Sequence, residues 1–84
     1  MATKFDPQLH ILRSVARSME DNRQRQEAKS ARFNLFAALE QNDRESALTW
    51  LEALEVSLKC AEWSMPAATV ASAQRAIAAI RSGL

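Results

Sequence analysis

The sequence predicts an all-α protein, a small antiparallel bundle of three to four helices in which residues 1–84 form a single domain. Between Pro7 and Pro66 there is no glycine and no proline, and these two residue types interrupt helices most strongly. The same stretch is rich in Ala, Leu, Glu, Gln and Arg, which are good helix formers. Apolar residues also recur there at three- and four-residue steps, as one face of a helix requires.

The first helix is expected to begin with Asp6 as its N-cap and Pro7 in its first turn. Its apolar stripe consists of Leu9, Leu12, Val15, Ala16 and Met19. After the polar segment 20–27, a second stripe follows on nearly the opposite side of a continuous helix, formed by Ala28, Ala31, Leu35 and Leu39. We therefore expect a break near residues 21–22. The alternative is one helix over 7–41 whose two halves contact different partners.

A short αα-hairpin joint is expected near residues 41–45. Two caps for the next helix are open: Asn42 with Glu45 as a capping box, or Asp43. Either cap predicts a very short connection between helices that pack antiparallel.

The helix expected over 43–63 is apolar on most of its circumference. Its charged side chains form one narrow ridge, made of Glu52, Glu55, Lys59 and Glu62. Such a wide apolar arc is typical of a central helix that is covered on more than one side. Trp50 and Trp63 lie on this helix, and tryptophan is enriched at the centres of interfaces. We expect at least one of them to contribute to a partner surface.

The last helix begins at Pro66, which suits a first helical turn but not a helix interior. Five of its apolar residues follow the spacing of a heptad seam, namely Val70, Ala73, Ile77, Ile80 and Leu84. Within this seam, Ile77 and Ile80 are predicted to contact a partner.

Composition excludes several classes of protein. The single cysteine leaves no intramolecular disulfide and no cysteine-based zinc site. The N-terminal residues lack the apolar core of a secretory signal, and no apolar run approaches the ~20 residues of a membrane span. A cytoplasmic protein without membrane contact is expected. The excess of Arg over Lys and the abundance of Ala hint at a bacterial or phage genome.

No group of residues resembles a catalytic or metal site. His10 is the only histidine and Cys60 the only cysteine, so an active pair would require His10 to activate Cys60 across the bundle. Ordinary structural roles are favoured for both residues. The sequence has no glycine-rich phosphate loop. We expect no enzymatic activity, no cofactor, no metal and no small-molecule substrate.

Positive charge is concentrated in residues 1–32, which carry seven basic and four acidic residues, a net charge of +3. At i,i+4 spacing, Arg17 can pair with Asp21. Arg23 can pair with Glu27 in the same way. The basic residues that remain on one helix face are Arg25, Lys29 and Arg32. Such a strip can hold a few phosphates.

These observations favour a non-enzymatic regulator, adaptor or inhibitor that binds protein through its helical surfaces and forms a homodimer. The predicted contact residues are Trp50, Trp63, Ile77 and Ile80. The alternative is a nucleic-acid-binding regulator that uses Arg25, Lys29 and Arg32.

Overall fold

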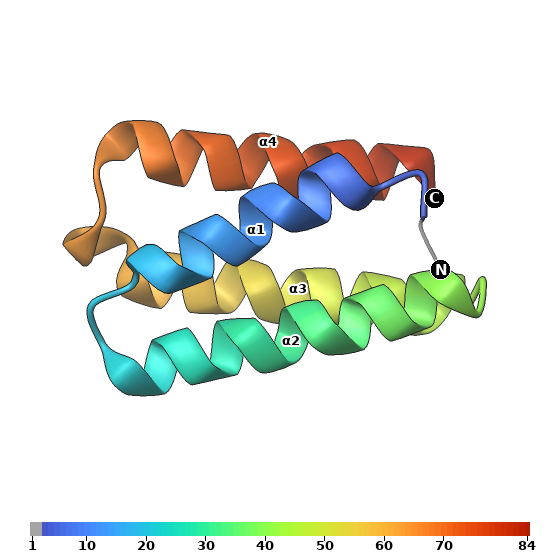
Figure 1. Ribbon diagram of the computed structural model, residues 1–84, viewed down its shortest axis with the longest axis horizontal. Coiled ribbons are helices and arrows are strands. Elements are labelled where there is room, and N and C mark those ends of the chain that lie inside the picture. The colour runs from blue at the N-terminus through green and yellow to red at the C-terminus, as the bar shows by residue number, and fades with distance from the viewer. Residues whose placement is uncertain (1–2) are drawn as a thin grey trace.

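The computed structural model describes residues 3–84. Four helices and one short 3-10 turn account for most of them (Figure 1). Their bounds are α1 Asp6–Ser18, α2 Asn22–Glu40, α3 Arg44–Ala61, η1 Glu62–Ser64 and α4 Ala67–Gly83. No strand occurs among the described residues. The predicted all-α bundle is confirmed, with four helices.

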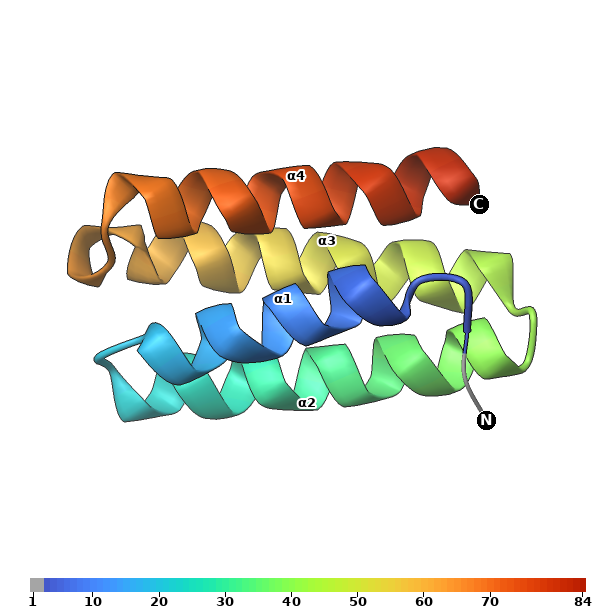
Figure 2. The ribbon, with the colours of Figure 1, turned by 45° about the horizontal axis from the view of Figure 1, so that its top comes forward.

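Each helix runs antiparallel to its two neighbours in the bundle. α1 packs on α2 and α4, and α3 packs on the same two helices, so that α1 and α3 lie diagonally opposite each other (Figures 1 and 2). The α1–α2 and α3–α4 joints lie at one end, and the α2–α3 joint lies at the other. This is an up-down-up-down four-helix bundle with extents of 33 × 22 × 19 Å.

The break predicted near residues 21–22 is confirmed, since α1 ends at Ser18 and α2 begins at Asn22. The Asp21 side chain caps α2 by accepting hydrogen bonds from the main-chain N–H groups of Arg23 and Gln24, at 2.8 and 3.1 Å. Because the chain reverses here, both apolar stripes can face one core.

The α2–α3 joint combines two capping motifs. Asn42 has a left-handed φ of 55°, and the N–H groups of Asn42 and Asp43 donate to the carbonyls of Leu39 and Ala38, at 3.2 and 2.9 Å. These two bonds form a Schellman motif with Asn42 in the position that glycine usually takes. The Asp43 carboxylate then caps α3 by accepting from the Ser46 N–H at 3.1 Å. Asp43, and not Asn42, is therefore the N-cap.

The start of α1 differs from the prediction that Asp6 is its N-cap. Helix α1 begins at Asp6 itself, with Phe5 in the N-cap position, and the Asp6 carboxylate accepts from the Thr3 N–H at 3.0 Å. The Phe5 ring is buried against the last turn of α4. A Cβ built on Gly83 would lie 2.6 Å from that ring, so the only glycine is placed where backbone and ring meet closely.

All four helices contribute to one hydrophobic core. Its most completely enclosed large side chains are Leu35, Leu51 and Ile80. The seam of α4 faces this core: Ile77 and Ile80 are only 3% and 0% exposed. The prediction that these two residues contact a partner is corrected here, because both lie in the protein's own hydrophobic core.

Helix α3 is covered on more than one side, as its wide apolar arc predicts, but it is no more central than the other three helices. It packs on α2 and α4 but leaves an outer side uncovered, where Val56 is 59% exposed. Trp63, on the following turn, is 71% exposed. The bundle has one helix at each corner, so each helix keeps one side in contact with solvent.

Candidate functional site

The outer side of α3 and the η1 turn after it carry small and large apolar residues three or four positions apart. We call this set, made of Ala53, Val56, Cys60 and Trp63, the α3 stripe. Ala53 is half-buried, and the other three are exposed. Among the described residues, the exposed large hydrophobic side chains are Phe33, Val56 and Trp63. Two of these three belong to the α3 stripe.

The two tryptophans have different environments. Trp50 is half-buried and packs against the hydrophobic core. Trp63 lies on η1, beyond the end of α3, and projects into solvent. Of the predicted contact residues, Trp63 is thus the one fully presented at the surface.

Charged residues border the α3 stripe. Glu52 and Lys59 are exposed on the same flank, seven residues apart and opposite in sign. Farther round the helix, Glu55 forms an ion pair with Arg81 of α4, which ties the two helices together beside the stripe.

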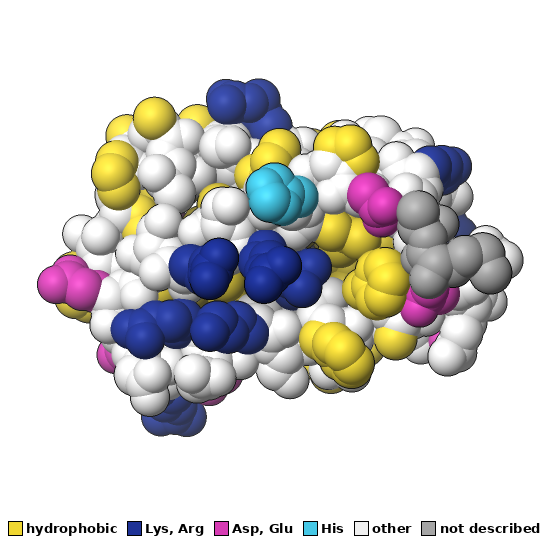
Figure 3. Space-filling view, viewed as in Figure 1, with side chains coloured by type: hydrophobic (Ala, Val, Ile, Leu, Met, Phe, Trp, Pro, Cys, Tyr) yellow, Lys and Arg dark blue, Asp and Glu magenta, His cyan; other side chains and the backbone are white. Residues whose placement is uncertain are grey.

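A second surface is strongly basic and lies on α1 and α2. Lys and Arg side chains gather there in the middle of the face shown in Figure 3. We call this surface the basic face and define it by Arg13 and Arg17 of α1 with Lys29 and Arg32 of α2. Within residues 3–84, no hydrogen bond or ion pair joins these four side chains to another residue. The expected Arg17–Asp21 pair is absent because Asp21 caps α2 instead.

Within the basic face, two guanidinium groups lie close together. Arg32 is half-buried, and this burial, together with the neighbouring Arg13, lowers the pKa of Arg32 below its usual value. Arginine nevertheless stays charged at neutral pH. The hairpin therefore brings two like charges together with no acidic group to compensate them.

Arg25 has a different role from the one predicted. Its guanidinium donates to the main-chain oxygens of Met19 and Glu20, both at 3.1 Å, and to the Asn22 side chain at 3.4 Å. It thus closes the joint that follows α1, where carbonyl groups lack helical partners. Arg25 is a structural cap, and Lys29 and Arg32 remain available from the predicted strip. No local feature of the sequence indicates that Arg13 and Arg17 lie on the same surface as Lys29 and Arg32.

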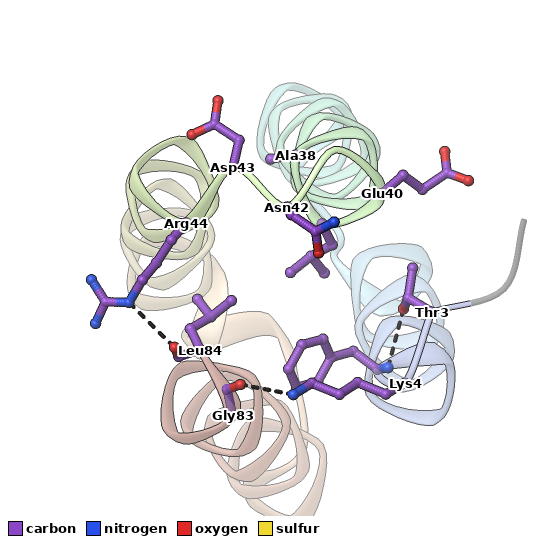
Figure 4. Close-up of a pocket in the computed structure, with 11 residues that line it drawn as sticks. Thr3, Lys4, Ala38, Glu40, Asn42, Asp43, Arg44, Gly83 and Leu84 are labelled. Atoms are coloured by element: carbon purple, nitrogen blue, oxygen red, sulfur yellow. Dashed lines mark hydrogen bonds between the residues drawn. The ribbon is translucent and has the colours of Figure 1, made fainter.

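A hollow of about 530 Å³ lies at the end of the bundle where the α2–α3 joint meets α4 (Figure 4). Lys4 donates to the main-chain oxygen of Gly83 at 3.0 Å, and Arg44 donates to that of Leu84 at 3.3 Å. Cations are favourable at the C-terminal end of a helix. Both basic groups here are therefore engaged in holding the last turn of α4.

His10 and Cys60 do not meet. His10 lines a shallow groove between α1 and α4, whereas Cys60 is exposed on the diagonally opposite helix α3. Residues 3–84 contain no group of three or more His, Cys, Asp or Glu side chains arranged to hold a metal ion.

Comparison of the chain with known protein families, with curated proteins and with solved structures found no match. None of the helices in the described part of the chain has both the length and the hydrophobicity needed to cross a bilayer.

Proposed function

We propose that this protein is a non-enzymatic interaction module, a small regulator or adaptor, that docks a protein partner on the α3 stripe. The observation that carries the proposal is the 71% exposure of Trp63 on the turn that follows α3, the helix on which Val56 and Cys60 are exposed as well. Large exposed apolar side chains that gather on one face are typical of interaction surfaces. Tryptophan is also among the residues that contribute most to binding energy.

A second copy of the chain fits this surface. The spacing of the stripe, in steps of three, four and three residues, reads the same in both directions. Antiparallel pairing about a two-fold axis would place the small Ala53 opposite the large Trp63, and Val56 opposite Cys60. Residues at such spacing interlock across paired helices, and a two-fold interface joins the same patch on both subunits.

The flanking charges do not help this arrangement. Pairing Ala53 with Trp63 and Val56 with Cys60 places Glu52 level with residue 64 of the other copy and Lys59 level with residue 57. The two Lys59 groups therefore lie on the same flank close to the two-fold axis, where their like charges oppose pairing. A single helix face is small beside the about 800 Å² that each partner contributes to a standard interface. The dimer should therefore be weak and in exchange with the monomer.

The reactivity of the Cys60 thiol tests this proposal without a label. Pairing covers Cys60, so its reaction with a chromogenic disulfide should slow as the protein concentration rises. In Trp63→Ala the rate should not depend on concentration. Phe33→Ala is the matched control, because Phe33 is 66% exposed but lies on α2, and it should behave like the wild type. A wild-type rate that is independent of concentration would rule out the antiparallel dimer.

A further inference from the structure

We propose that the basic face binds single-stranded nucleic acid, with its four cations on the phosphates and the exposed ring of Phe33 beneath a base. This surface lies on α1 and α2, whereas the α3 stripe lies on the helix diagonally opposite α1. The inference is therefore independent of the function proposed above. It would make the molecule a link between a protein surface and a nucleic acid.

The arrangement of charge suits a chain of phosphates. Arg13 and Arg17 are four residues apart on α1, a rise of about 6 Å, and Lys29 and Arg32 form a second short row on α2. The two rows lie on packed antiparallel helices, whose axes are typically about 8–10 Å apart. Since none of these cations has an acidic partner within residues 3–84, bound phosphates would relieve the repulsion between Arg13 and Arg32.

Phe33 adds a feature that a solvated basic surface does not need. It follows Arg32 directly, lies one helical turn beyond Lys29, and is 66% exposed. Proteins that bind single strands combine a positive surface with aromatic side chains on which bases stack. Stacking on Phe33 requires an unpaired base, so the combination favours a single strand over a duplex. An acidic peptide offers no comparable flat group, and a membrane surface would favour a broader apolar border.

Fluorescence anisotropy with a labelled oligothymidylate of about ten nucleotides tests the proposal. With four phosphate contacts, the logarithm of the association constant should fall with the logarithm of the salt concentration at a slope of about −3. Raising the salt from about 50 to 200 mM should therefore weaken binding about 50-fold. Arg17→Gln/Lys29→Gln removes two exposed cations and should halve this slope. Arg75→Gln/Arg81→Gln, which removes the same charge from α4, is the matched control and should leave the slope unchanged.

Phe33→Ala separates stacking from charge. It should weaken binding about fivefold or more while leaving the salt slope unchanged. Because Phe33 is exposed, the variant should keep the helical content and the thermal midpoint of the wild type. The proposal fails if the oligothymidylate does not bind, or if the control double variant lowers the slope as much as Arg17→Gln/Lys29→Gln. It also fails if polyglutamate or a duplex binds more tightly than the single strand, or if Phe33→Ala binds like the wild type.

Discussion

Replacing Arg25 by Gln should destabilise the fold because it removes the guanidinium that closes the α1–α2 joint. That group donates to the main-chain oxygens of Met19 and Glu20, both at 3.1 Å, and glutamine is too short to replace both bonds. Each bond at this partly exposed site should contribute about 0.5–1 kcal/mol. The free energy of unfolding should therefore fall by about 1–2 kcal/mol, and the thermal midpoint by about 5–15 °C.

Urea denaturation followed by far-UV circular dichroism measures this loss. The matched control is Arg23→Gln, which breaks the 3.2 Å ion pair between Arg23 and Glu27 on the solvent-facing side of α2. An exposed i,i+4 pair contributes only about 0.3–0.5 kcal/mol. The reasoning is refuted if Arg25→Gln costs no more than Arg23→Gln. A drop of about 0.7 in the salt slope of oligothymidylate binding for Arg25→Gln would show instead that Arg25 contacts phosphate.

Two further substitutions test particular contacts. Gly83→Ala should destabilise the protein by about 1 kcal/mol despite the better helix propensity of alanine, because the added Cβ would lie 2.6 Å from the Phe5 ring. Thermal unfolding should show this loss of stability. The loss should disappear when the same substitution is made in a Phe5→Leu variant. Asp43→Asn keeps an N-cap but removes a carboxylate whose pKa is lowered by hydrogen bonds from Ser46. A carboxylate whose pKa is lowered by folding stabilises the fold at pH values above its ordinary pKa. This stabilisation is lost as the pH falls and the group becomes protonated. Below about pH 4, urea denaturation should therefore show stability falling more steeply for the wild type than for Asp43→Asn, and parallel curves would contradict this role.

The joints of the bundle could be predicted because their signals are local. The change of apolar phase across residues 20–27 located the α1–α2 break, and the polar cluster at 41–45 located the hairpin. The left-handed conformation of Asn42 shows how the chain turns without glycine. Sequence spacing alone still left Asn42 and Asp43 as competing caps, because both side chains can accept a hydrogen bond from the next turn.

The surfaces were harder to predict because helical spacing shows which residues share a face but not which face turns inward. Ile77 and Ile80 form a regular seam that would suit either a core or an interface, and the packing of four helices decides for the core. The same packing leaves Val56 uncovered. Arg13 and Arg32 are far apart in sequence and become neighbours only when the α1–α2 hairpin closes.

Sedimentation equilibrium of the wild type and Trp63→Ala tests the central claim, that the α3 stripe is a docking surface, most directly. Burial of about half of the exposed Trp63 area in each copy should contribute about 4 kcal/mol to the dimer, roughly a thousandfold in Kd. The account predicts that the wild-type mass rises from 9.4 kDa toward twice that value as concentration increases, while Trp63→Ala stays monomeric and Phe33→Ala follows the wild type. A monomeric wild type at every concentration, or a Trp63→Ala variant that dimerises equally well, would contradict it.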